Sequence, residues 1–324
     1  MAIPQSSILA IAPMMNYTDR HYRYLMRLLC PRTVLYTEMV TAMALVHGEV
    51  EHLLAFDESE HPLVLQLGGS DPQLLAKAAK LAAEYAYDEI NLNVGCPSPR
   101  VQEGRFGACL MAEPDLVAEC IVAMREASGL AVTVKTRLGI GRAEVTAQLY
   151  PLIEKLAALK VEHFIIHARN AWLEGLSPKE NRTIPPLNYE AVLKLQQDFP
   201  TLSFTLNGGI QTLEDIMKLS SQFSGLMIGR AAYHHPYMIA EAERVLYKNN
   251  SPLPDRAEVV SHYYQYALEQ LAQGSRLYAL LKPLLGLFLG EPKGRLWRRL
   301  LSGVAAANSD PQIMLQALEQ VRAC

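Results

Sequence analysis

The segment Asn91-Leu92-Asn93-Val94-Gly95-Cys96-Pro97 reads as a β-strand that runs directly into a tight turn. Polar and apolar side chains alternate as far as Val94, which is the pattern of a strand with two different faces. A glycine and a proline then interrupt the strand on either side of a single cysteine. Functional side chains of parallel α/β proteins collect at the carboxyl ends of strands, where loops shape the binding site. The segment therefore predicts a strand end that carries a thiol.

Similar strand patterns recur on both sides of this segment. Each of the first seven is followed by a stretch long enough for a helix, and some helices carry clear start signals, such as Asp71-Pro72 and the capping box from Thr212 to Asp215. The eight expected strands occupy residues 8–13, 33–38, 62–67, 89–94, 131–137, 163–167, 202–206 and 225–228.

This alternation favours a (β/α)₈ TIM barrel, an α/β fold whose typical size is about 250 residues. An open, doubly wound sheet is the alternative. The barrel is the better interpretation because eight strands can be counted and no GxGxxG motif follows the first of them.

The alternation ends near residue 248. Residues 248–254 read as a turn-rich linker, and only helical patterns follow, beginning with residues 257–273. We therefore predict a catalytic TIM barrel over residues 1–248 and a small all-helical C-terminal domain over residues 249–324. The whole chain has a net charge of −3, but basic residues outnumber acidic ones from residue 251 onward.

Composition excludes several classes of protein. Half of the 324 residues are hydrophobic, so the chain can bury a full core. The five cysteines form no CxxC pair, which argues against a disulfide framework and a structural metal site and favours a cytoplasmic location. Residues 1–7 lack the pattern of an export signal, and the apolar stretch 277–289 is too short to cross a membrane. No obligate protein partner is evident from the sequence.

Unusual side chains collect at the ends of nearly all the expected strands. Any one of them could be a capped strand end or a hydrogen-bonded buried group, but a complete ring of them indicates one lined mouth of the barrel. The members are Pro13-Met14-Met15-Asn16, Glu38, Gln66, Asn93 with Cys96, Lys135 with Arg137, His167 with Arg169, Asn207-Gly208-Gly209, and Gly229-Arg230.

Two members of this ring predict a phosphate site. Asn207-Gly208-Gly209 follows the seventh strand and Gly229-Arg230 follows the eighth. In TIM barrels these two positions commonly hold a phosphate, through exposed backbone N–H groups and a positive charge. The cofactor or the substrate is therefore expected to carry a phosphate.

Lys135 and Cys96 are the candidate chemical groups. Lys135 could form a Schiff base, join a structural ion pair, or place a cation over a negatively charged ring. The phosphate site and Gln66 favour the third role, with a flavin whose reduced ring is anionic. Cys96 could be a nucleophile, an acid or a small buried hydrophobe. A free thiol has a pKa of about 8.5, so it is mostly protonated at neutral pH and can donate a proton.

Two basic segments have the composition of a nucleic-acid contact. One is residues 293–299, in which Trp297 could stack on a base or pack in the core. The other is the loop over residues 169–182, with Lys179 inside it. A solvated helix face is the alternative for the first segment.

Taken together, these motifs resemble those of the flavin-dependent tRNA-dihydrouridine synthases, and within that family the chain is most similar to the synthase A subfamily. The resemblance extends over essentially the whole chain. It rests on Ala12-Pro13-Met14-Met15, Asn93-Val94-Gly95-Cys96-Pro97-Ser98, Lys135-Thr136-Arg137-Leu138-Gly139, His167-Ala168-Arg169, Asn207-Gly208-Gly209, Gly229-Arg230 and the helical tail.

The resemblance implies an enzyme that uses FMN and NADPH to reduce uridine to 5,6-dihydrouridine in the D-loop of tRNA, at positions 20 and 20a. Hydride would pass from reduced FMN to C6 of the base, and Cys96 would protonate C5. FMN would be held by Pro13, Met14, Met15, Gln66, Lys135, His167, Asn207, Gly208, Gly209, Gly229 and Arg230. The tRNA would be held by Asn93, Arg169, Lys179, Arg182, Arg295 and Arg298.

Three other functions remain open on the residues alone. Lys135 would serve a Schiff-base aldolase. A barrel without catalysis could still bind RNA through its basic segments. A flavin oxidoreductase of the same fold acting on a small molecule would have no use for Arg295 and Arg298.

Overall fold

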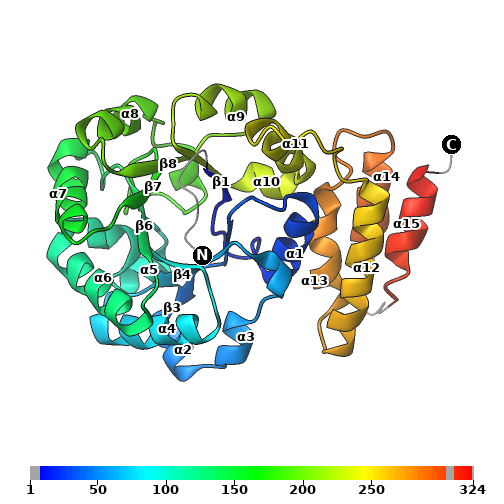
Figure 1. The fold of residues 1–324 in the computed structure, drawn as a ribbon, viewed down its shortest axis with the longest axis horizontal. Helices are drawn as coiled ribbons and strands as arrows, with labels where there is room; N and C mark the ends of the chain where they lie inside the picture. Colours follow the sequence, from blue (N-terminus) through cyan, green and yellow to red (C-terminus); the bar gives the residue numbers. More distant parts are fainter. Residues whose placement is uncertain (1–7, 304–309, 323–324) are drawn as a thin grey trace.

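A computed structural model describes residues 8–303 and 310–322. The first seven residues, on which the expectation about export rests, lie outside this range. Figure 1 shows a barrel of strands surrounded by helices, with a group of further helices packed on one side.

The strands form a single parallel barrel. Its order is β1-β9-β8-β7-β6-β5-β4-β2, and every pairing is parallel. Two backbone hydrogen bonds close the ring between β1 and β2. The N–H of Ile11 donates to the carbonyl of Val34, and the N–H of Val34 donates to the carbonyl of Leu9, each at a distance of 2.9 Å. The strands are β1 (Ile8–Ile11), β2 (Leu35–Tyr36), β4 (Leu63–Gly68), β5 (Glu89–Val94), β6 (Val132–Arg137), β7 (His163–His167), β8 (Ser203–Asn207) and β9 (Gly225–Ile228).

All eight expected strands are confirmed, with ends that differ by a few residues. The sequence did not indicate β3 (Val40–Thr41), a short strand that pairs with the end of β4. The barrel interpretation is therefore correct and the open sheet is wrong.

Helices cover the outside of the barrel between successive strands. The expected start signals are present: Asp71 caps α4 by accepting from the backbone N–H groups of Gln73 and Leu74, and Thr212 and Asp215 form a capping box on α9. The helices are α1 (Arg20–Leu29), α2 (Ala42–His47), α3 (Val50–Leu54), α4 (Pro72–Glu84), α5 (Pro99–Glu103), α6 (Pro114–Ser128), α7 (Val145–Ala158), α8 (Tyr189–Asp198), α9 (Leu213–Ser220), α10 (Arg230–His234) and α11 (Tyr237–Leu246), with 3₁₀ turns η1 (Glu58–Glu60), η2 (Gly107–Ala112) and η3 (Glu180–Arg182).

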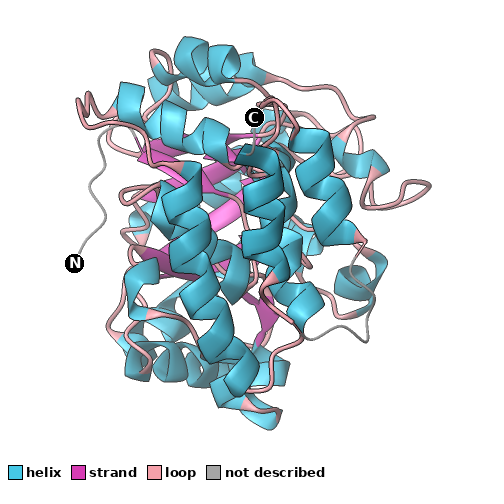
Figure 2. Cartoon of the chain, turned by 90° about the vertical axis from the view of Figure 1, so that its right-hand side faces the viewer, coloured by secondary structure: helices cyan, strands magenta, loops and turns pink. Residues whose placement is uncertain are grey.

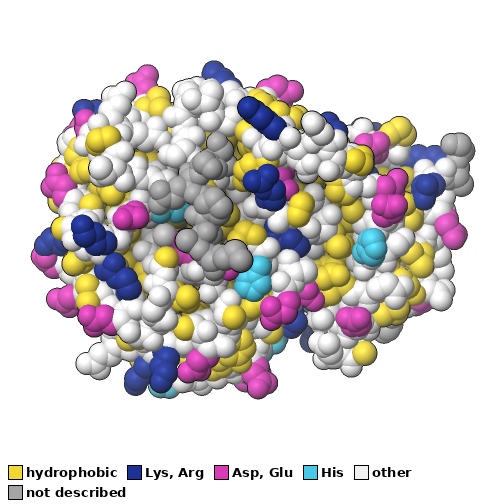
Figure 3. Space-filling view, viewed as in Figure 1, with side chains coloured by type: hydrophobic (Ala, Val, Ile, Leu, Met, Phe, Trp, Pro, Cys, Tyr) yellow, Lys and Arg dark blue, Asp and Glu magenta, His cyan; other side chains and the backbone are white. Residues whose placement is uncertain are grey.

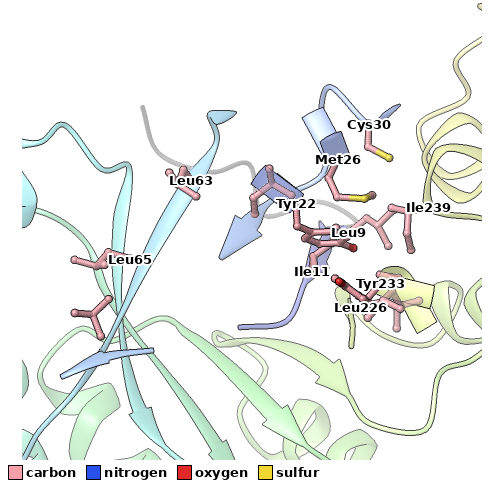
Figure 4. Packing of buried hydrophobic residues seen from close by; sticks show 14 of the residues in the cluster. Leu9, Ile11, Tyr22, Met26, Cys30, Leu63, Leu65, Leu226, Tyr233 and Ile239 are labelled. Carbon is pink, nitrogen blue, oxygen red and sulfur yellow. The ribbon is translucent and has the colours of Figure 1, made fainter. Parts of the chain in front are cut away.

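The alternation of side chains along β1 separates two layers of core. Leu9 and Ile11 point outward and pack with Tyr22 and Met26 of α1 and with Ile239 of α11 (Figure 4). The intervening residues belong to a smaller cluster of barrel side chains, made of Ile8, Ala10, Ala12, Val34, Tyr36, Val64, Ile165 and Met227. The period of two along the strand is what divides these two layers.

After residues 248–254 the described parts of the chain, up to residue 303 and over 310–322, contain helices and no strand, as expected. They are α12 (Arg256–Ala272), α13 (Leu277–Leu281), η4 (Lys282–Gly286), α14 (Gly294–Ser302) and α15 (Ile313–Arg322). Figure 2 shows them standing in front of the strands when the molecule is turned by 90°.

These C-terminal helices dock on α1 and α10. The ring of Tyr266 stacks on Tyr24 with centroids 3.9 Å apart, and its hydroxyl lies 2.8 Å from Nδ1 of His21. A Cβ added to Gly286 would lie 2.5 Å from the carbonyl oxygen of His234, so the two backbones touch there. The basic tail is thus fixed against the barrel by aromatic and backbone contacts. Among the described helices, none is long and apolar enough to span a membrane.

Candidate active site at the carboxyl ends of the strands

Cys96 follows β5 in a turn that the last residues of the strand hold in place. The side-chain oxygen of Asn93 accepts from the backbone N–H groups of Gly95, at 3.2 Å, and of Cys96, at 2.9 Å. The thiol is half-buried and its sulfur lies 3.5 Å from the hydroxyl of Ser98. Asn93 is therefore both a strand residue and the cap of the cysteine turn.

Two glycines permit this turn. A Cβ on Gly95 would lie 3.1 Å from the backbone of Thr136 on the neighbouring strand. Gly107 has φ of +66°, and a Cβ there would lie 2.6 Å from the carbonyl oxygen of Cys96. A larger residue at either position would push the cysteine away from the barrel.

Lys135 lies two residues before the end of β6, and its side chain reaches Asn207 of β8. Its amino group donates to Oδ1 of Asn207 at 3.0 Å, and the amide nitrogen of Asn207 donates in turn to the carbonyl of Met227 at 2.8 Å. Burial, together with the smaller effect of the Arg137 charge, lowers the pKa of Lys135 to about 7. An anion bound beside the amino group would restore its positive charge.

His167, at the end of β7, presents a neutral ring. Burial holds its pKa well below the usual value, and the charges of Arg137 and Lys135 act in the same direction. Its buried Nδ1 has no hydrogen-bond partner among the described residues. Because buried polar atoms are nearly always paired, this nitrogen is a candidate contact for a bound ligand.

The glycine turn after β8 brings the backbone against His167. Gly208 and Gly209 have φ of +107° and +76°, and a Cβ on Gly208 would lie 2.8 Å from the His167 ring. The hydroxyl of Tyr189 donates to the carbonyl of Gly208 at 2.7 Å. Only glycine fits both the backbone conformation and this close approach.

The turns after β1 and β9 lie side by side, because these strands are neighbours in the barrel. A Cβ on Gly229 would meet only the sulfur of Met14, at 3.9 Å. Pro13, Met14 and Arg230 are half-buried, and Met15 is 53% exposed. The structure therefore brings the expected cofactor residues of β1, β6, β7, β8 and β9 to one end of the barrel.

Gln66 lies inside the barrel and contacts the residue that caps the cysteine turn. Its Oε1 accepts from the amide of Asn93 at 2.9 Å, and its Nε2 donates to Asn91 at 2.8 Å. Asn91 was not among the residues that the sequence motifs indicated. The signal was present in the run from Glu89 to Asn93, where every second residue of a buried strand is polar.

Arg137 ties the cysteine turn to the loop that follows β7. Its Nε donates to the carbonyl of Gly95 at 3.0 Å, and its Nη1 donates to the carbonyls of Asn170, at 3.1 Å, and Asn181, at 2.9 Å. Burial lowers its pKa to about 10, so it remains charged at neutral pH. The sequence marked Arg137 as a strand-end residue without revealing this bridge.

The expected tRNA-binding residues differ in exposure. Arg169 is only 9% exposed, and its Nη1 donates to the carbonyls of Thr183, at 3.3 Å, and Pro185. Lys179 and Arg182 are exposed. Although Arg182 is exposed overall, partial desolvation and then the charge of Arg230 lower its pKa, so these two arginines lie close to each other.

Arg295 and Arg298 are exposed on α14, away from this ring (Figure 1). Trp297 of the same helix is fully buried, and its indole donates to the carbonyl of Leu284 at 2.8 Å. Trp297 is therefore a core residue and cannot stack on a base. On the face shown in Figure 3, basic and acidic side chains are interspersed.

In residues 8–303 and 310–322 no group of three or more His, Cys, Asp or Glu side chains could hold a metal ion.

Comparison with known proteins agrees with the strand-end motifs. The family model described as dihydrouridine synthase (Dus) matches residues 10–322. The tRNA-dihydrouridine(20/20a) synthase of Synechocystis sp. is 49% identical over 312 residues, which are 96% of this chain and 93% of that protein. The protein of the same name from Salmonella typhimurium is 50% identical over 314 residues, covering 96% and 94% of the two chains.

A solved structure, morphinone reductase, superposes with a TM-score of 0.52 over 79% of this chain and 93% of that one. At 10% identity it shows the barrel fold alone. The match of the family model over nearly the whole chain, and the identity with full-length relatives, show that this chain belongs to the dihydrouridine synthase family.

Proposed function

We propose that this chain reduces uridines 20 and 20a of tRNA to dihydrouridine, with FMN as its cofactor, NADPH as the electron donor and Cys96 as the proton donor. The observation that carries the proposal is the cysteine turn. It holds a half-buried thiol at the carboxyl end of β5, next to a strand that carries the half-buried Lys135 two residues before its end. Membership of the family sets aside the Schiff-base aldolase.

The strand-end residues fit a phosphorylated flavin. His167 offers a buried, unpaired ring nitrogen, and Lys135 offers an amino group whose charge an anion would stabilise. The glycine turn at Gly208 and the half-buried Arg230 suit the phosphate. Bound there, FMN would supply the hydride for C6 of the uracil.

Cys96 would deliver the proton to C5. The resulting thiolate would be stabilised by three cations, because Lys135, Arg137 and Arg182 all lie close enough for the charge of Cys96 to shift their pKa values. The side-chain oxygen of Asn93 accepts from the backbone N–H of Cys96. Together with Cys96, Asn93 would contact the target base.

The uridine must leave its stack to reach this end of the barrel, at a cost of a few kcal/mol. Contacts to the rest of the tRNA would supply that energy, from Lys179 and Arg182 beside the site and from Arg295 and Arg298 on the tail. Arg169 would act indirectly, because its guanidinium donates to backbone carbonyls of the loop that follows β7 and so holds that loop in place. We assign these roles to a catalytic barrel over residues 1–248 and a tRNA-binding helical domain over residues 249–324, in a cytoplasmic enzyme.

The first experiment is a visible absorption spectrum of the purified protein, followed by anaerobic bleaching with NADPH. We expect a flavin spectrum that bleaches and then recovers only when unmodified tRNA is added. A matched tRNA with cytidine at positions 20 and 20a should leave the flavin bleached, and mass spectrometry should locate dihydrouridine at those two positions.

A colourless protein that cannot be reconstituted with FMN would contradict the cofactor assignment. Equal recovery with both tRNAs would contradict the assigned positions. Binding of tRNA without oxidation of NADPH would instead indicate a non-catalytic RNA-binding barrel.

A further inference from the structure

A continuous line of hydrogen bonds runs through the inside of the barrel, starting at the cysteine turn. From Asn93 it passes through Gln66 and Asn91 to Thr133 and ends at the carboxylate of Glu89. Its four links measure 2.9, 2.8, 3.0 and 2.6 Å. It connects the Cys96 turn to the opposite end of β5.

The two ends of this line impose one direction on every link. At the upper end, the backbone N–H groups of Gly95 and Cys96 can only donate, so Asn93 must present its oxygen to them and its nitrogen to Gln66. Gln66 must then present its own nitrogen to Asn91.

At the lower end a carboxylate accepts. The hydroxyl of Thr133 donates to Glu89. The oxygen of that same hydroxyl is then free to accept from the amide nitrogen of Asn91. Asn91 must then present its oxygen to Gln66. The upper end therefore fixes the orientation of all three amide groups, and the ionised form of Glu89 selects the same orientation.

Burial makes these orientations hard to change. The exposed fractions are 0% for Asn91, 1% for Gln66, 5% for Thr133, 6% for Glu89 and 9% for Asn93. A flipped amide in this line would place two donors or two acceptors face to face without water to replace the lost bond. Burial also raises the pKa of Glu89 to about 7, against the opposing effect of the Thr133 hydrogen bond.

We propose that Glu89, Thr133 and Asn91 are positioning residues of the active site. By fixing which atom Gln66 and Asn93 present, they hold the Cys96 turn in one geometry and present one fixed pattern of donors and acceptors to the ligand. The effect on turnover rests on the proposed function. The effect on the turn itself does not.

The matched pair Thr133→Val and Thr133→Ser tests this. Valine keeps the shape of a β-branched strand residue but removes the link, whereas serine retains the hydroxyl. We expect backbone hydrogen exchange at Gly95 and Cys96 to become about fivefold faster in Thr133→Val, on the scale of one lost hydrogen bond, and to remain as in the wild type in Thr133→Ser. The amides of Gln73 and Leu74, which Asp71 caps on α4, serve as the control and should not change.

Turnover provides the second measurement. In Thr133→Val we expect kcat for dihydrouridine formation to fall by about fivefold with an unchanged KM for tRNA, and in Thr133→Ser we expect recovery. If the wild type makes no dihydrouridine, the proposed function is wrong. The hydrogen-exchange measurement would still test whether the line of hydrogen bonds holds the cysteine turn.

A second pair keeps the test decisive if Thr133→Val does not fold. Glu89→Leu removes the terminal acceptor together with a buried carboxylate, and Glu89→Gln restores an acceptor oxygen. We expect Glu89→Leu to behave as Thr133→Val, and Glu89→Gln to behave as the wild type. Unchanged exchange at the cysteine turn in the breaking variants, or equal acceleration at the α4 control amides, would overturn the proposal.

Discussion

The charged groups at the carboxyl ends of the barrel strands contrast with those on α14. Lys135 and Arg137 are largely enclosed, make defined hydrogen bonds, and have pKa values lowered by burial. Arg295 and Arg298 are exposed, on a helix whose inner face buries Trp297. The first pair is held in place before any ligand binds, whereas the second pair can adapt to one.

This difference separates two ways of using positive charge. Charges in a low-dielectric, hydrogen-bonded setting act strongly over short distances and are little affected by salt. Exposed charges act weakly, one phosphate at a time, and are screened. Substitutions in the two regions should therefore differ in both size and salt dependence.

The largest effect is expected at Cys96. Replacement by alanine should lower dihydrouridine formation by about 100-fold or more, because a positioned acid contributes about 10² to 10⁴ to rate. FMN should remain bound and should still be reduced by NADPH, which the absorption spectrum will show. Cys109→Ala, at the half-buried cysteine of η2, is the matched control and should turn over normally. Full turnover in Cys96→Ala would remove this residue as the acid.

The next largest effect is expected at Lys135. Lys135→Met should bind FMN on the order of tenfold more weakly, because a hydrogen bond to a charged group is lost. In the wild type, FMN affinity should fall as the pH rises above about 7, since the free lysine then loses its proton. Titration of the apo-protein with FMN at several pH values measures both, and Lys135→Met should show a flatter pH profile.

The same substitution should stabilise the protein without its cofactor. Because the folded pKa of Lys135 is lowered to about 7, the unfolded chain binds more protons between that pH and about 10.4. The free energy of unfolding therefore rises with pH across that window. Below about pH 7, the destabilisation from burying the charged lysine is fully present. Lys135→Met should unfold at a higher temperature than the wild type at pH 6, and the gain should shrink toward pH 10. Lys218→Met, at an exposed lysine of α9, should show no such trend.

The smallest effect is expected on α14. Arg295→Ala and Arg298→Ala should each weaken tRNA binding by about two- to fivefold. Each should also reduce the slope of log affinity against log salt by about 1, as the loss of one phosphate contact would. Binding titrations at several salt concentrations measure both quantities, with Lys218→Ala as the charge-matched control. An unchanged salt slope would show that these arginines lie on a solvated helix face and do not contact tRNA phosphates.

Local patterns predicted the architecture well. Each expected strand is a run of apolar or β-branched residues, and the helix caps at Asp71 and Thr212 form as predicted. The strand missed, Val40–Thr41, has two residues and is held by its pairing with β4. So short a segment carries no period of its own, which is why the sequence could not reveal it.

The candidate site was predicted as a set of strand ends, and its internal connections were not. The sequence marked Lys135 and Asn207 separately, but their hydrogen bond joins residues 72 positions apart. It left two roles open for Trp297, and only the packing of α14 decided for the core. The alternation from Glu89 to Asn93 marks polar positions on one face of a strand, but the pattern alone does not say whether that face lines the barrel or meets solvent. Asn91 and Thr133 therefore received no role from the sequence.

The sequence by itself determined the barrel, the thiol at the end of β5 and the glycine turns after β8 and β9, because strand period, capping and backbone freedom are properties of neighbouring residues. Only the tertiary structure decided which polar groups meet, which amide atoms they present and how far burial shifts their pKa values. Those properties depend on strand register and on exclusion of water, and both arise when distant segments pack together.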